Sequence, residues 1–180
     1  KLQKLPIRFI RNNSINVNKL KTMCRKLKKR GKIDLLILDY LQLMSGSKSQ
    51  NREQEISEIS RAMKNLATEL NIPVIALSQL NRALEARQDK RPMMSDLRES
   101  GAIEQDADMI FLLNRPAKYG IEKVETDGGR EISSQGILMC DIAKQRNGAT
   151  GEVMLMHNNT VTRIWDYDES GNNDFKDEPF

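Results

Sequence analysis

Two continuous apolar runs of strand length constrain the fold of this chain more than any other feature. The first covers residues 33–38, interrupted only by Asp34, and the second covers residues 74–77. Strands covered on both faces, as in the centre of a parallel sheet, have such sequences. Between the runs, apolar residues recur at three- and four-residue steps and predict one amphipathic helix: Ile56, Ile59, Met63, Leu66 and Leu70. The order strand, helix, strand predicts an α/β fold with a mostly parallel sheet and flanking helices.

Shorter patterns predict elements before these runs. Residues 7–10 are typical of a short strand, and residues 12–14 (NNS) supply turn and helix-capping side chains. One face of the helix expected next is apolar, while Lys and Arg occupy the rest: Val17, Leu20, Met23, Cys24 and Leu27. Gly31 follows at the usual position for a left-handed cap.

The second half of the chain predicts further strands. Residues 109–113 and 136–143 are typical of strands, and the segment 116–135 between them is expected to be a surface hairpin or loop. Residues 152–156 and 161–165 predict a terminal hairpin, with His157 in its turn. The acidic segment 166–180 lacks the hydrophobicity to hold an ordered structure. We therefore expect one domain over residues 1–165 and a disordered tail over 166–180.

Composition excludes several classes of protein. Aromatic residues make up only 4% of the chain, so nucleobase stacking on aromatic side chains is not expected. No apolar run approaches the roughly 20 residues that span a bilayer, so we expect no membrane partner. Cys24 and Cys140 lie far apart and cannot complete a zinc site with His157, which favours a reducing, cytoplasmic setting. Residues 1–33 carry twelve Lys and Arg and no acid, which is compatible with nucleic-acid binding or with a solvated helix face.

Polar residues end both apolar runs. Asp39 follows the first run and Gln79 follows the second, and in doubly wound sheets ligands bind beyond the carboxyl ends of the strands. There Asp39 would face a nucleotide and its magnesium, and Gln79 would donate to a terminal phosphate or orient water. The alternatives are that Asp39 caps the next turn and that the two side chains are unrelated.

Two basic segments are further candidates. Lys144 and Arg146 would lie on one face if the strand continued through them, where they could clamp a phosphate. The segment 96–101 is typical of a helix start, at which Arg98 and free backbone N–H groups suit a nucleic-acid phosphate. It is equally typical of a capping box between Asp96 and Glu99. The long charged stretch 80–94 before it is expected to be functional or disordered.

Seven stretches, in this order, identify a family. They are residues 38–44 (LDYLQLM), 58–61 (EISR), 73–82 (PVIALSQLNR), 90–92 (KRP), 95–101 (SDLRESG), 103–108 (IEQDAD) and 144–148 (KQRNG). Over residues 5–165 the chain resembles the C-terminal, RecA-like motor domain of the DnaB replicative helicases. The resemblance implies an ATP-dependent DNA helicase that uses Mg²⁺ and moves 5′ to 3′ on single-stranded DNA during replication. It also implies a homo-hexamer, with primase and a helicase loader as partners through regions outside this chain.

The resemblance assigns roles to individual residues. Asp39 matches the Walker B acid that holds Mg²⁺ through water, and Gln79 matches the residue that senses the γ-phosphate. Arg146, with Lys144 and Gln145 beside it, matches the arginine finger that reaches the ATP of the adjacent subunit. The DNA-contacting loop of the family is matched by Arg98, Glu99 and Gly101.

Parts of the family pattern are missing from this sequence. It contains no glycine-rich phosphate loop ending in Gly-Lys-Ser/Thr, and the catalytic glutamate and collar domain that the family carries upstream are absent too. We therefore expect an incomplete RecA-like P-loop NTPase core from a longer protein, which on its own binds nucleotide weakly and does not hydrolyse it. Two other interpretations remain: a non-catalytic DNA-binding or oligomerisation module, and a RecA-type recombinase.

Overall fold

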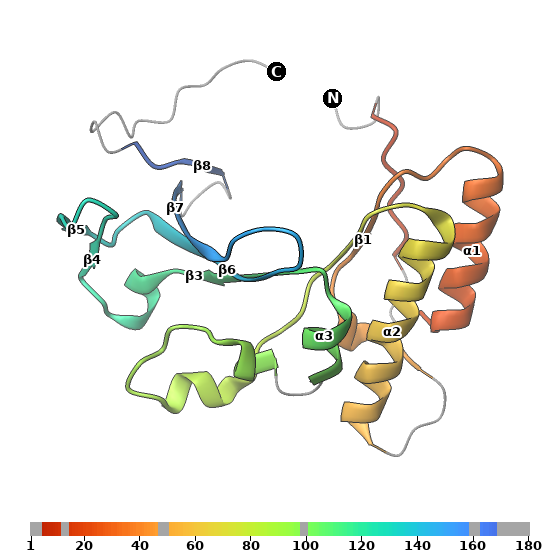
Figure 1. The fold of residues 1–180 in the computed structure, drawn as a ribbon, viewed down its shortest axis with the longest axis horizontal. Helices are drawn as coiled ribbons and strands as arrows, with labels where there is room; N and C mark the ends of the chain where they lie inside the picture. The colour runs from red at the N-terminus through yellow and green to blue at the C-terminus, as the bar shows by residue number, and fades with distance from the viewer. Residues whose placement is uncertain (1–4, 12–14, 47–50, 98–100, 159–162, 169–180) are drawn as a thin grey trace. The chain divides into compact units, whose positions relative to one another are not determined.

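The computed structural model of the chain describes residues 5–11, 15–46, 51–97, 101–158 and 163–168 (Figure 1). The chain divides into two compact units: the first comprises Lys1–Gln79 and Glu99–Asp106, and the second comprises Leu80–Arg98 and Ala107–Phe180. Among the described residues, every helix is too short or too polar to cross a membrane. Most of the predicted tail lies outside the described residues, so its disorder stays a prediction.

The first unit contains a parallel strand pair and its helices. Its elements are α1 (Val17–Lys29), β1 (Leu36–Leu38), the 3-10 helix η2 (Leu41–Leu43), α2 (Arg52–Leu70), β2 (Val74–Ala76) and α3 (Gly101–Asp106). β1 and β2 pair in parallel, with Leu36 opposite Val74 and Leu38 opposite Ala76. The predicted strand–helix–strand unit with parallel strands is therefore confirmed.

Asparagine side chains set the starts of both long helices. The Asn16 carboxamide oxygen accepts the Asn18 N–H at 2.8 Å at the start of α1, and Asn51 does the same for Glu53 at 3.0 Å at the start of α2. These bonds satisfy N–H groups that have no partner inside the helix. The predicted capping residues 12–14 lie outside the described residues, and Asn16 takes that role.

Left-handed residues follow the helices. Asn71, with φ of 48°, ends α2, and Gly31, with φ of 61°, follows α1 as the sequence predicts.

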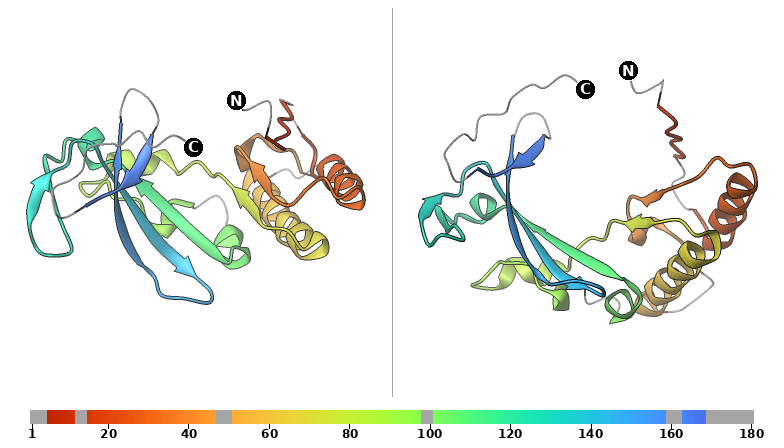
Figure 2. Two further views of the ribbon diagram at one scale, coloured as in Figure 1. Left: turned by 90° about the horizontal axis from the view of Figure 1, so that it is seen from above. Right: turned by 45° about the horizontal axis from the view of Figure 1, so that its top comes forward.

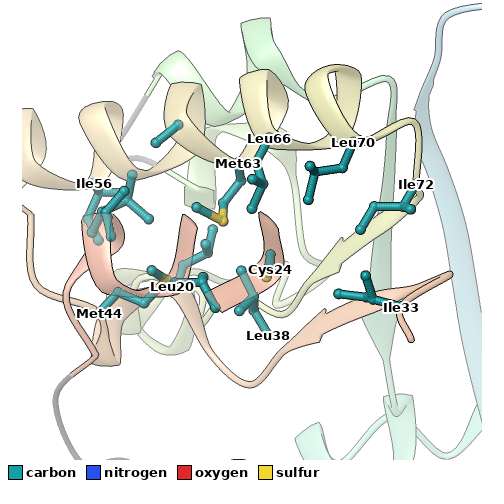
Figure 3. Close-up of a cluster of buried hydrophobic side chains, with 14 residues drawn as sticks. Leu20, Cys24, Ile33, Leu38, Met44, Ile56, Met63, Leu66, Leu70 and Ile72 are labelled. Carbon is teal, nitrogen blue, oxygen red and sulfur yellow. The ribbon is translucent and has the colours of Figure 1, made fainter. Parts of the chain in front are cut away.

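The core of the first unit lies between the two helices and the strands. In the close-up of Figure 3, side chains from α1, including Leu20 and Cys24, face those of α2, including Met63 and Leu66. All five residues of the predicted apolar face of α2 are buried, with Ile56, Ile59 and Leu66 fully inaccessible: Ile56, Ile59, Met63, Leu66 and Leu70. The three- to four-residue spacing of apolar residues in the sequence therefore predicted the α2 side of this core correctly.

The strands of the first unit differ from expectation in two ways. Ile37 on β1 is 59% exposed and Ile75 on β2 is 50% exposed, so coverage of both faces was a wrong prediction for the described residues. Residues 7–10 form no strand, and Phe9 is 82% exposed. The tetrapeptide IRFI is rich in residues that favour strands, but a strand also requires a neighbour to complete its hydrogen bonds.

The second unit is built on an antiparallel sheet. Its strands are β3 (Met109–Asn114), β6 (Ile137–Gln145), β7 (Gly151–His157) and β8 (Ile164–Asp166), in the order β3-β6-β7-β8. In both views of Figure 2, β3, β6 and β7 run side by side. The chain is thus mixed α/β, and the mostly parallel sheet predicted from sequence is not what the described strands form.

The connections of the second unit match the predicted surface excursion and terminal hairpin. The excursion contains η5 (Pro116–Tyr119) and a hairpin of β4 (Lys123–Glu125) and β5 (Glu131–Ser133). In the terminal hairpin, Met156 of β7 lies opposite Trp165 of β8. His157 belongs to β7 rather than to the turn in which the sequence placed it.

An ion pair organises the long charged stretch that begins at residue 80. This stretch contains the 3-10 helices η3 (Arg82–Ala86) and η4 (Met94–Leu97). The Arg87 guanidinium donates to both carboxylate oxygens of Asp96, at 3.0 and 2.9 Å, and also to the Arg91 carbonyl at 2.7 Å. Asp96 is only 7% exposed and accepts the Met93 N–H at 2.8 Å. Its carboxylate therefore braces the preceding loop, while the alternative capping box with Glu99 lies partly outside the described residues and stays a prediction.

Candidate functional site

Asp39 and Gln79 lie at the carboxyl ends of neighbouring parallel strands. Asp39 follows β1 directly, and Gln79 comes three residues after the end of β2. The backbone continues the pairing beyond the strands, because the Leu77 N–H donates to Leu38 and the Leu41 N–H donates to Leu77, both at 2.9 Å. The peptide bond between Asp39 and Tyr40 is cis. Both side chains belong to exposed residues at this edge, which is the arrangement the sequence predicts.

The carboxamide of Gln42 joins the two strand ends. Its Nε2 donates to the Ser78 hydroxyl at 2.9 Å and to the Gln79 carbonyl at 3.2 Å, while its Oε1 accepts the Gln79 N–H at 3.2 Å. A primary amide can donate and accept at once, so one side chain fixes both polar groups of the Gln79 backbone. Sequence reasoning assigned Gln42 no such role, and only its place in the motif after Asp39 could have indicated one.

A second set of contacts holds the segment that carries Gln42. Arg52 of α2 donates to the Gln42 carbonyl and pairs with Glu55. The Gly46 N–H donates to Glu55 at 2.9 Å and, with Arg52 beside it, lowers the pKa of that carboxyl. The start of α2 therefore fixes the turn that follows Asp39.

Lys144 and Arg146 both reach the two residues that precede β3. Lys144 Nζ donates to the Ala107 carbonyl at 2.7 Å. The Arg146 N–H donates to the Asp108 carbonyl at 2.9 Å, and Arg146 Nη1 lies 3.2 Å from Asp108 Oδ1. The sequence predicts a shared face if the strand continues through both residues, but β6 ends at Gln145 and Arg146 lies in the following turn, so the two cations are related by their contacts with Ala107 and Asp108. Sequence reasoning missed Asp108, because its partner lies far along the chain.

A β-bulge adjusts the end of β6. Ile110 lies opposite Lys144 but Phe111 lies opposite Ile142, so Ala143 is an extra residue on β6. Such an insertion turns the following side chains relative to the regular pleat. Gln145, which is half-buried, is the last residue of the strand. Its side chain packs so close to Gly148 that a Cβ at Gly148 would lie 2.4 Å from Gln145 Nε2. The bulge thus lies immediately before the residues assigned to the nucleotide.

The predicted DNA-binding residues are only partly described. Arg98 and Glu99 lie outside the described residues, so their assignment stays a prediction. Gly101 is the exposed first residue of α3, and among the described residues a Cβ there would meet nothing within 4 Å. Space therefore does not require glycine at this position.

The residues at the end of β1 suit a magnesium ion that is bound with a nucleotide. Mg²⁺ keeps several waters and uses one or two carboxylates together with phosphate oxygens. Asp39 offers one exposed carboxylate of this kind, and the described residues contain no cluster of three or more His, Cys, Asp or Glu that could hold a metal alone. Asp39 fits an ion whose other ligands come from water and phosphate.

Comparison with known proteins identifies relatives over most of the chain. A family model described as the DnaB-like helicase C terminal domain matches residues 1–166. The replicative DNA helicase DnaB of Geobacillus stearothermophilus is 50% identical over 144 residues, which are 79% of this chain and 30% of that protein. The replicative DNA helicase DnaC of Bacillus subtilis is 50% identical over 143 residues, 78% of this chain and 30% of its own length. The chain therefore spans about a third of these relatives.

Solved structures give the same result. A DnaB-like replicative helicase, studied with its interactions with primase, matches with a TM-score of 0.77 at 40% identity, over 88% of this chain and 36% of that one. A second solved structure, described as an ATPase domain, matches with a TM-score of 0.74 at 41% identity, over 86% of this chain and 52% of that one. This chain is therefore similar to these proteins in backbone arrangement and in about 40% of the aligned residues.

Proposed function

Because this chain belongs to the DnaB-like helicase C-terminal domain family, we propose that it is part of the motor of an ATP-dependent replicative DNA helicase. The proposed protein translocates 5′ to 3′ on single-stranded DNA and unwinds duplex DNA ahead of it. The observation that carries the proposal is the strand-end pair of Asp39 and Gln79, joined through Gln42. Most of the relatives' length lies outside this chain, so the activity belongs to the whole protein.

The strand-end pair would act on the nucleotide phosphates. Mg²⁺ bound with ATP would neutralise charge that develops on the phosphates during transfer. Asp39 would hold that ion through water. Gln79 would donate its side-chain amide to the γ-phosphate, while Gln42 keeps the Gln79 backbone in place. Because Gln42 also reaches Ser78 on the segment after β2, a shift at Gln79 would pass to the residues that follow Asp39.

Lys144, Gln145 and Arg146 would serve the ATP of the adjacent subunit in a homo-hexamer. Arginine suits this role because its guanidinium presents several donors to phosphate oxygens and stays charged. Arg146 lies just beyond the end of β6, in the turn towards β7, and it is 54% exposed, so a neighbouring subunit can reach it. The catalytic unit would then be the interface between two subunits.

The experiment that tests the function measures unwinding by the full-length protein that contains this chain. With ATP and Mg²⁺, a duplex with a 5′ single-stranded tail should be unwound, and one with a 3′ tail should not. Strand exchange without unwinding would favour a RecA-type recombinase. Single-stranded DNA binding with no ATP turnover would favour a non-catalytic binding or oligomerisation module. Because a related structure was studied with primase, stimulation by primase is a further readout.

Replacing Arg98 tests the proposed DNA loop. Arg98→Ala in the full-length protein should weaken single-stranded DNA binding to a similar degree for all sequences, because phosphate contacts carry no base information. Affinity decreases as salt increases, and the magnitude of the slope of log affinity against log salt should become smaller by about 1. Titrations of several oligonucleotides at a series of salt concentrations measure both quantities. Arg130→Ala, on the β4–β5 hairpin, is the matched control, and equal slopes for the two variants would contradict the assignment.

A further inference from the structure

We propose that Asp108 is a positioning residue for Arg146, and that it holds the guanidinium ready for the phosphate of the neighbouring subunit. This inference rests on the proposed function of Arg146 as a residue that acts on ATP in trans. It comes from one observation: Asp108 binds Arg146 at both ends, through its carbonyl to the backbone N–H at 2.9 Å and through its carboxylate to Nη1 at 3.2 Å.

The two contacts fix both ends of a long side chain. An unrestrained arginine samples many rotamers, and that freedom would be lost when it met a phosphate. Asp108 removes part of this freedom beforehand. Since Nη1 is one of three nitrogens, donors on Nη2 and Nε can still point at a phosphate. A carboxylate beside the guanidinium therefore orients it without excluding the nucleotide.

The neighbouring cation is held from the same place. Lys144 Nζ donates to Ala107, the residue before Asp108, at 2.7 Å. The bulge at Ala143 lies just before both cations on β6. The Ala107–Asp108 segment is thus a common support for the two cations that the proposed function assigns to the nucleotide of the next subunit.

Stability does not account for the ion pair. The Asp108 and Arg146 side chains are 53% and 54% exposed, and ion pairs at such positions contribute little to folding because water screens them. The backbone bond between the two residues and the strand pairing of β3 with β6 do not depend on the carboxylate. Asp108→Asn should therefore leave the unfolding transition unchanged while removing the negative charge that holds the guanidinium.

Turnover in the full-length hexamer tests the inference. Asp108→Asn should lower kcat for DNA-stimulated ATP hydrolysis about tenfold, the scale of a modest misplacement, with KM for ATP unchanged. Asp108→Glu, which keeps the charge, should recover part of the rate. Glu131→Gln is the matched control, because it removes the exposed Lys123–Glu131 pair elsewhere in the same unit and should leave kcat unaltered. An unchanged or raised kcat for Asp108→Asn would overturn the inference, and a raised value would identify Asp108 as a brake.

Two combinations separate positioning from general damage. In an Arg146→Ala background, Asp108→Asn should cause no further loss, because the group it positions is gone; additive losses would contradict the proposal. Mixed with Gln79→Ala subunits, Asp108→Asn subunits should recover activity, since some interfaces then have both sides intact. If Arg146→Ala itself leaves turnover unchanged, the proposed function of Arg146 fails. If Arg146→Ala abolishes turnover and Asp108→Asn does not alter it, only the role of Asp108 fails.

Discussion

In the full-length protein, Arg146→Ala is expected to reduce the proposed ATP turnover roughly a thousandfold or more, while nucleotide binding stays largely intact. The reason is that a finger stabilises charge that develops during transfer and contributes less to the bound ground state. Arg146 can be removed without loss of buried packing, because its side chain is 54% exposed. Steady-state hydrolysis together with direct nucleotide titration measures the two quantities separately.

Mixing experiments decide whether Arg146 acts in trans. Subunits with Arg146→Ala keep their own strand-end pair, and subunits with Gln79→Ala keep their own arginine. A mixed ring contains some interfaces with both parts intact, so turnover should return, whereas each variant alone stays inactive. Failure of every mixture to recover would mean that Arg146 serves its own subunit. Arg130→Ala, an exposed arginine on the β4–β5 hairpin, should behave like the unsubstituted protein.

The second large effect concerns stability. Leu66→Ala should destabilise the first unit by about 2–5 kcal/mol, because it removes a fully inaccessible side chain and leaves a cavity between the helices (Figure 3). This is a large fraction of the roughly 5–15 kcal/mol by which domains are stable. Leu43→Ala is the control: Leu43 is 49% exposed, so its loss should cost only about 1 kcal/mol.

Cys24 reports on the first unit alone. Its thiol is 1% exposed, and burial raises its pKa, so reagents that attack the thiolate should reach it only when the unit opens. The reactivity of Cys24 at increasing urea concentration therefore gives the unfolding free energy of this unit, even if the second unit unfolds separately. Protection of Cys24 that is equal in Leu66→Ala and Leu43→Ala would contradict the assigned core.

Local sequence predicted some parts of the fold better than others. The face of α2 and the parallel pairing of β1 and β2 followed from periodicity and from the strand–helix–strand order, since both depend on neighbours in the chain. The direction of β3 did not, because an apolar strand has much the same composition in either orientation. Residues 7–10 satisfied strand propensity but form no strand.

Some residues of the candidate site could likewise be predicted from the sequence, and others could not. Asp39 and Gln79 could be placed because strand ends of a parallel pair meet at one edge. Gln42, Asp96 and Asp108 could not, because their roles depend on partners far along the chain or on a loop that no propensity describes. Side chains that only support a site are therefore harder to predict from the sequence than the side chains that are proposed to contact the ligand.

The exposed face of β1 and β2 has a consequence for the behaviour of this chain, taken by itself, at high concentration. Ile37 and Ile75 present β-branched side chains to water on two short strands, a surface through which chains can associate face to face. Asp34 and Asp39 flank the apolar residues 35–38. Charges in such flanking positions oppose aggregation of the strand between them. Asp39 is thus also a gatekeeper against self-association, and neutralising it would lower colloidal stability as well as remove the carboxylate proposed to hold magnesium through water.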